Sequence, residues 1–116
     1  MTPSKKTAMN NHEVSSRFFT GIISVLSKRT SRSYSLVVLA SLKKDLSRKF
    51  RFFEYISINE KKIGIDIQIN KVNEAMLGKM FMRIIDILGQ SLLKARIQEE
   101  LDKKTVKCLV NMGVTF

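Results

Sequence analysis

Hydrophobic residues recur at helical spacing in the first half of the chain. Over residues 13–27 apolar side chains return every three or four positions, which predicts a first helix in which Gly21 is a mild weakness. A second helix is expected over residues 33–49, because one face carries Leu36, Leu39, Leu42, Leu46 and Phe50. Residues 36–40 are apolar all round and are expected to be buried. The connection is small, polar and basic, and Ser31 or Ser33 is suited to cap the second helix.

The clearest strand signal lies at residues 63–70, where isoleucines alternate strictly with glycine or polar residues. Such alternation places the isoleucines on one face. Residues 52–58 are aromatic and β-branched, and residues 59–62 form a short polar connection, so the two segments predict an antiparallel hairpin. A hairpin alone is marginally stable. Its isoleucine face is therefore expected to pack on helices or to pair with another chain's sheet.

The last third of the chain has a helical period again. A long helix is expected over residues 71–96, with Asn70 or Asn73 as its cap and a polar stripe that includes Lys79 and Arg83. A shorter helix is expected over residues 97–112. Glutamates at 99 and 100 precede lysines at 103 and 104 with the i,i+4 spacing of stabilising ion pairs. Gly113 is expected to terminate this helix, with the next residue folding back on it.

These elements predict the fold class and the domain organisation. Residues 1–12 contain a proline, paired lysines and paired asparagines without a hydrophobic period, which predicts a disordered basic leader. Residues 13–116 have the length of a single globular domain with one core. The predicted fold is α+β and mostly helical: two helices, an antiparallel β-hairpin, a long helix and a short C-terminal helix.

The charge of the chain is concentrated in one segment. Its 116 residues include 21 Lys and Arg against 10 Asp and Glu, a formal net charge of +11. Between positions 28 and 51 lie eight of these cations and one acid, Asp45, which together supply +7. Surfaces that only need to be soluble usually mix both signs, whereas a concentrated field of one sign attracts polyanions.

This segment leads to the first functional hypothesis, a small basic, non-enzymatic module that binds DNA or RNA. Phosphate contacts give affinity with little base selectivity. Phe53 and Tyr55, expected on the outer face of the first strand, are the candidates for stacking on bases. The predicted phosphate-binding residues are Lys28, Arg29, Arg32, Lys43, Lys44, Arg48, Lys49 and Arg51, with Arg17, Lys5 and Lys6 as supporting charges.

The order helix, connector, helix and hairpin also occurs in winged-helix DNA-binding domains. There the second helix enters the major groove and exposes its N-terminal half. Residues 36–40 are apolar at this place, which argues against sequence-specific reading.

The alternative hypothesis is an assembly subunit that uses the hairpin edge and the long helix 71–96. Two glycines eleven residues apart lie on one side of this helix and permit close approach of another helix, from the same chain, a second copy or a different protein. The basic segment would then dock an acidic protein. Peripheral binding to anionic lipid ranks below both. The predicted interface residues are Gly78, Met82, Ile85 and Gly89.

The remaining composition argues against common chemistries. Cys108 is the only cysteine, which rules out an intramolecular disulfide and a cysteine-rich zinc site and favours a reducing, cytoplasmic location. His12 stands alone, and phosphate-binding glycine motifs are absent. No segment approaches the ~20 apolar residues of a membrane-spanning helix, so the protein is expected to be soluble. We therefore expect no enzymatic activity, no cofactor and no metal.

Overall fold

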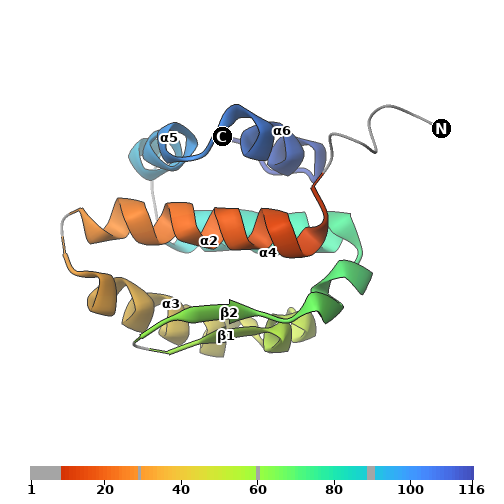
Figure 1. Cartoon of the computed structure of the whole chain (residues 1–116), viewed down its shortest axis with the longest axis horizontal. Coiled ribbons are helices and arrows are strands. Elements are labelled where there is room, and N and C mark those ends of the chain that lie inside the picture. Colours follow the sequence, from red (N-terminus) through yellow and green to blue (C-terminus); the bar gives the residue numbers. More distant parts are fainter. Residues whose placement is uncertain (1–8, 29, 60, 89–90) are drawn as a thin grey trace.

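The computed structural model describes residues 9–28, 30–59, 61–88 and 91–116. It confirms an α+β, mostly helical fold with an antiparallel hairpin between the second and third helices described (Figure 1). Two 3-10 helices, η1 and η2, flank the hairpin. The elements in order are α2 (Asn11–Ser27), α3 (Arg32–Leu46), η1 (Arg51–Tyr55), β1 (Ile56–Ile58), β2 (Ile63–Ile65), η2 (Ile67–Lys71), α4 (Glu74–Leu88), α5 (Ser91–Glu100) and α6 (Lys103–Asn111).

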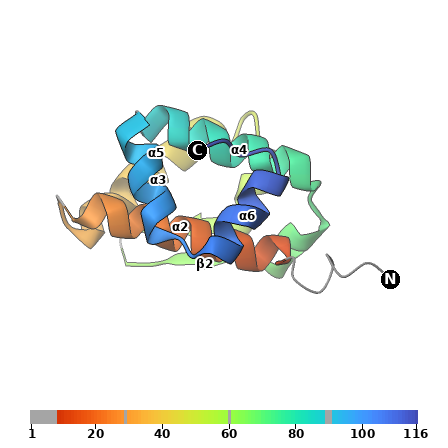
Figure 2. The same cartoon turned by 90° about the horizontal axis from the view of Figure 1, so that it is seen from above.

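Helix α2 occupies the middle of the molecule. In Figure 1, α3 and the hairpin lie on one side of it and α5 and α6 on the other. Figure 2 shows α5 and α6 crossing above α2 and α4. Aromatic rings link the layers: the Phe18 and Phe81 ring centroids lie 4.2 Å apart, and those of Phe19 and Phe53 lie 6.2 Å apart. All four phenylalanines are fully buried, so the core is built around α2.

Helix α3 largely confirms its prediction. The Ser31 hydroxyl caps it by accepting a hydrogen bond from the Tyr34 amide, at 3.1 Å. The predicted apolar face, from Leu36 to Phe50, is buried. However, Val37 is 52% exposed, so the prediction that residues 36–40 are buried all round is wrong. The reason is that α3 lies at the surface and has neighbours on one side only.

The hairpin exists but is shorter than predicted. Its strands pair Ile56 with Ile65 and Ile58 with Ile63, in antiparallel register. The alternation of isoleucines ends at Asp66, whose carboxylate accepts a hydrogen bond from the Gln68 amide at 2.9 Å and caps η2. Residues 51–55 form η1 in place of the first strand's beginning. Phe53 consequently points into the core, which corrects its predicted place on the outer face.

The predicted long helix is two helices, α4 and α5, and residues 89–90 lie outside the described residues. Asn73 caps α4, as predicted, by accepting from the Ala75 and Met76 amides. Helix α6 begins only after Asp102, so the predicted i,i+4 ion pairs join residues of different helices and are wrong. The predicted glycine terminus is confirmed: Gly113 has φ of +100° and the Val114 amide bonds the Leu109 carbonyl at 3.0 Å.

The apolar face of α4 is covered by the chain's own C-terminal segment. A Cβ on Gly78 would lie 2.0 Å from the Met112 carbonyl oxygen, which only glycine permits. The Met82 sulfur accepts a hydrogen bond from the Thr115 amide at 3.1 Å, and Ile85 is fully buried. The close approach expected at these positions is therefore intramolecular, and Gly78 and Ile85 offer no open surface to a partner. Gly89 lies outside the described residues.

The fold begins earlier than the predicted boundary after residue 12. Met9 is 6% exposed, and the side-chain nitrogen Nδ2 of Asn11 donates to the carbonyls of Ile69 and Val72 at 3.0 and 2.7 Å. His12, for which no metal-binding or catalytic role is predicted, bonds the Ile65 carbonyl through Nε2 at 3.0 Å. Residues 9–12 thus belong to the folded part, and the leader prediction for residues 1–8 lies outside the described residues.

Candidate nucleic-acid interface

The predicted basic segment ends with the last turn of α3, the connection that follows it and the first residue of η1. We call these residues, 43–51, the basic turn. The Ser47 amide and hydroxyl both bond the Lys43 carbonyl, at 2.8 and 2.6 Å. The amides of Lys49 and Phe50 bond the Leu46 carbonyl, at 3.1 and 2.9 Å. These bonds fix the backbone from which the basic side chains project.

Burial alternates with charge along the basic turn. Leu46 and Phe50 are 5% and 2% exposed and anchor the turn in the core. Arg48 and Lys49 are exposed between these anchors, and Lys44 is exposed just before them. Arg51 is exposed at the start of η1, and Lys43 is half-buried. The core residues thus hold a short, fixed segment in which four of the five cations are exposed.

No carboxylate neutralises the cations of the basic turn within the described residues. The ion pairs there involve only Arg17 and Lys28 as cations. Asp45 and Glu54 lie in or next to the turn, yet neither comes within 4 Å of a basic nitrogen of a described side chain. Lys49 instead lies over the Phe50 ring, with Nζ 5.8 Å from the centroid. The five cations therefore form an uncompensated positive surface in the described part of the chain.

The eight predicted phosphate-binding residues do not form one patch. Lys28 caps the end of α2 and pairs with Glu100 at 2.9 Å, so its charge is compensated. Arg32 opens α3, and the 12 residues to Lys44 place it about 18 Å away along the helix axis. Arg29 lies outside the described residues. The structure thus brings together Lys43, Lys44, Arg48, Lys49 and Arg51.

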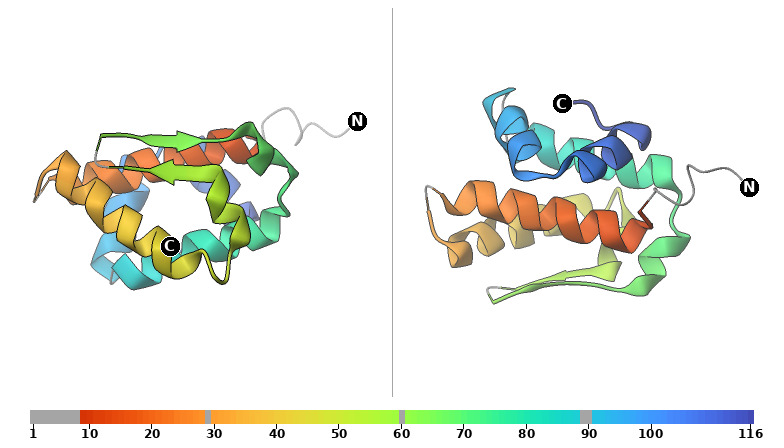
Figure 3. Two further views of the ribbon diagram at one scale, coloured as in Figure 1. Left: turned by 90° about the horizontal axis from the view of Figure 1, so that it is seen from below. Right: turned by 45° about the horizontal axis from the view of Figure 1, so that its top comes forward.

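A groove adjoins the basic turn, and helix α4 adds two further cations to it. Figures 2 and 3 show the turn after α3 beside α4. The groove has a volume of about 410 Å³. Lys49, Lys79, Arg83 and Asp86 supply its charged groups, and Met82 and Phe50 are among its apolar ones. We call it the basic groove. The residues that line it are Lys49, Phe50, Ala75, Lys79, Met82, Arg83, Asp86, Met112 and Gly113.

Sequence reasoning placed Lys79 and Arg83 on the polar stripe of a helix but did not connect them with the basic turn. Their four-residue spacing showed that they share one face of α4. No sequence signal indicated that this face lies beside residue 49, because that depends on how the C-terminal segment packs α4 into the fold. Met112 and Gly113, which also line the basic groove, belong to that C-terminal segment.

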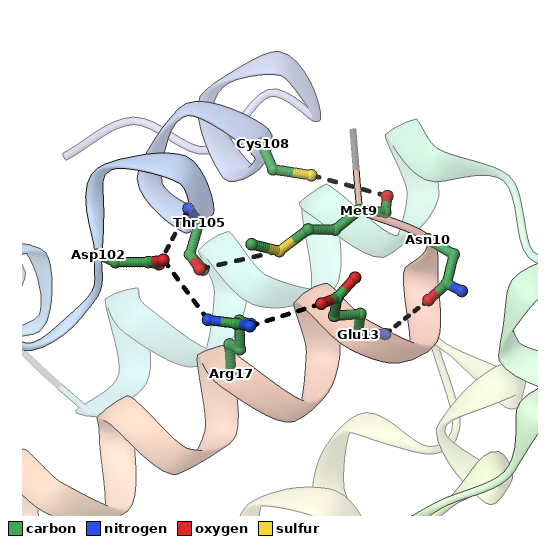
Figure 4. Close-up of polar contacts among 7 residues, drawn as sticks. All are labelled: Met9, Asn10, Glu13, Arg17, Asp102, Thr105 and Cys108. Atoms are coloured by element: carbon green, nitrogen blue, oxygen red, sulfur yellow. Dashed lines mark hydrogen bonds and ion pairs between the residues drawn. The ribbon is translucent and has the colours of Figure 1, made fainter. Parts of the chain in front are cut away.

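A second group of charged side chains, between α2 and α6, forms a network in which the charges have partners (Figure 4). Arg17 lies 3.5 Å from Glu13 and 3.4 Å from Asp102. Hydrogen bonding with the Thr105 side chain and, to a smaller extent, with the Thr105 amide at 3.1 Å lowers the pKa of the Asp102 carboxyl. We call Met9, Asn10, Glu13, Arg17, Asp102, Thr105 and Cys108 the N-terminal network.

Cys108 belongs to this network, and its surroundings do not activate the thiol as a nucleophile. Its thiol is half-buried and donates to the Met9 carbonyl at 3.9 Å, while the Thr105 hydroxyl donates to the Met9 sulfur at 3.8 Å. Burial raises the pKa of the Cys108 thiol, so less thiolate forms at neutral pH.

The outer face of α3 differs from the prediction in a way that concerns base contact. Tyr34 is 57% exposed and Val37 is 52% exposed, at i and i+3 on the same side of the helix. The argument against base reading by α3 rested on the apolar character of residues 36–40, and it is retained, because Leu36 and Leu39 are buried and the exposed Val37 side chain has no hydrogen-bonding group. Of the two predicted stacking residues, Phe53 is buried and Tyr55 is half-buried.

The described residues contain no group of three or more His, Cys, Asp or Glu side chains that could hold a metal ion. No helix among them combines the length and the apolar character needed to cross a membrane. Comparisons with models of protein families, with curated proteins and with solved structures find no match to the chain.

Proposed function

We propose that the protein is a small, non-enzymatic nucleic-acid-binding module that contacts phosphates through the basic turn. The observation that carries this proposal is the concentration, in a segment of nine residues, of five cations without an ion-pair partner in the described part of the chain. Arg17 and Lys28 have carboxylate partners, whereas the five cations of the basic turn have none among the described residues. Unpaired, exposed cations repel one another unless an anion binds, and a polyanion gathers several at once.

The helix dipole accounts for only two of the five cations of the basic turn. Lys43 and Lys44 lie in the last turn of α3, where cations interact favourably with the helix dipole. Arg48, Lys49 and Arg51 lie beyond the helix end, where that explanation does not apply. They project from a backbone fixed by hydrogen bonds and by the buried Phe50 ring, so binding requires little ordering of the main chain.

The number of cations sets the expected salt dependence. On duplex DNA each neutralised phosphate contributes about 0.9 to the slope of log affinity against log salt. If most of the basic turn is engaged, the slope should be about four. Contacts with phosphates carry no sequence information, so affinities for different sequences of one length should be similar.

The test is binding of labelled single- and double-stranded DNA and RNA, measured by fluorescence anisotropy over a series of salt concentrations. Sub-micromolar binding at near-physiological salt, with a slope of about four, supports the proposal. The double variant Lys44→Glu, Arg48→Glu should reduce affinity by about 100-fold and the slope by about two.

The matched control is Lys104→Glu, Lys107→Glu, which makes the same charge change at two exposed positions of α6. It should retain most of the affinity. Equal losses in both double variants would show that net charge alone governs binding, and binding that disappears by about 150 mM salt would overturn the proposal.

A further inference from the structure

We infer that the basic groove holds one unstacked nucleotide of a single-stranded nucleic acid, so that single strands are the ligand class of this module. The inference rests on the proposed function and adds the form of nucleic acid and the place where a base is held.

The chemistry of the groove matches a nucleotide better than it matches a simple anion. Lys49, Lys79 and Arg83 offer charge to phosphate oxygens from two elements. Asp86 also lines the groove, where its carboxylate opposes an inorganic anion but is an acceptor for a base amino group. Apolar side chains, Met82 among them, provide surface for a base, and thioether sulfur contacts aromatic rings favourably.

The volume of the groove restricts the form of the ligand. Its volume of about 410 Å³ lies in the range of pockets that hold one small organic group. A base in a duplex is paired and stacked and reaches such a pocket only after extrusion, at a cost of a few kcal/mol. A single strand presents splayed bases without that cost.

The groove is continuous with the proposed phosphate-binding surface. Lys49 belongs both to the basic turn and to the groove, and Arg48 and Arg51 lie one and two positions from it in the chain. A strand whose phosphates follow the basic turn therefore passes the groove. The Met82 sulfur, bonded by the Thr115 amide at 3.1 Å, is held in place before a ligand arrives.

The test compares three oligonucleotides of one length: a single strand, its duplex, and a single strand made entirely of abasic sites, which keeps the phosphates and removes the bases. At near-physiological salt the single strand should bind about tenfold more tightly than the abasic strand and more tightly than the duplex. Equal affinity for the abasic and base-containing strands overturns the inference and leaves phosphate binding intact. Failure of all three to bind overturns the proposed function itself.

A groove-filling variant locates the base. Ala75 is an exposed residue of α4 that lines the groove, and Ala75→Phe should remove the roughly tenfold advantage of bases while abasic binding is unchanged. The control is Ala95→Phe, at an exposed position of α5 outside the groove, which should retain the advantage. Retention of the advantage in Ala75→Phe overturns the inference, as does competition by a free mononucleotide as strong as that by the strand.

Discussion

The N-terminal network and the basic turn use the same residue types in opposite ways. In the network, Arg17 lies between two carboxylates, and Thr105, Met9 and Cys108 complete the contacts between α2 and α6. In the basic turn, five cations project from a fixed backbone without a carboxylate partner among the described residues. The difference shows that net charge alone is a poor guide to function in this chain. The informative property is whether cations without an ion-pair partner are gathered in one short segment.

The largest expected effect comes from the close contact that forms one wall of the basic groove. Gly78→Ala places a Cβ 2.0 Å from the Met112 carbonyl oxygen, so backbone must move. We expect a loss of about 3 kcal/mol in the free energy of unfolding and a fall in Tm of about 10 °C. Thermal unfolding followed by circular dichroism measures this. The displaced C-terminal segment should also reduce the preference for base-containing strands.

Gly21→Ala is the control for that substitution, at a buried glycine of α2. Its added Cβ would lie 2.7 Å from Leu101 Cδ2, the far end of a flexible side chain. Alanine in a helix interior gains roughly 1 kcal/mol over glycine, which offsets a small adjustment of the leucine. A stability change as large as that of Gly78→Ala would show that helix contacts in general, and not the Met112 carbonyl, limit residue size.

The next largest effect concerns Asp102, which both caps α6 and pairs with Arg17. Asp102→Ala should lower Tm by about 5 °C, because an N-cap is lost from a domain of this size. Asp102→Asn keeps a capping oxygen and removes the charge, so it should lose much less. Binding of nucleic acid should be unchanged in both variants. Reduced binding at constant salt would contradict the separation of the network from the basic turn.

Acid should destabilise the fold through Asp102 of the N-terminal network and through Glu100, two residues before it in the chain. Hydrogen bonds from Ser24 and Lys28 lower the pKa of the Glu100 carboxyl from its ordinary value of 4.5, and Thr105 lowers that of Asp102 from 3.8. A carboxyl whose pKa is lower in the folded state stabilises the fold above its unfolded pKa and loses that contribution as pH falls through the folded pKa. Tm should therefore fall as pH decreases below about 4.5.

The double variant Glu100→Gln, Asp102→Asn isolates this contribution. Its Tm should depend less on pH between 5 and 3 than that of the unmodified protein. If the Tm of the variant fell with decreasing pH as steeply as that of the unmodified protein, these two carboxyls would be excluded as the source of the pH dependence.

Local signals predicted much of the fold. The leucine face of α3, the Ser31 and Asn73 caps and the Gly113 terminus depend on residues within a few positions of one another, and all are present. The strand ends were wrong because Asp66 starts a 3-10 helix, which overrides the alternation of isoleucines. The basic groove could not be predicted, because Lys49 and Lys79 meet through packing between elements thirty residues apart.

The smallest expected effects come from neutralising one cation in each region. Arg17→Gln removes two exposed ion pairs, which individually contribute little, so Tm should fall by no more than about 2 °C with binding unchanged. Arg51→Gln removes a cation with no carboxylate partner among the described residues, so stability should be constant while the salt slope falls by about one. Thermal unfolding and the anisotropy salt series, applied to both variants, give four numbers. If Arg17→Gln lowers the salt slope as much as Arg51→Gln does, intramolecular pairing does not decide which cations reach phosphate, and the distinction between the two regions fails.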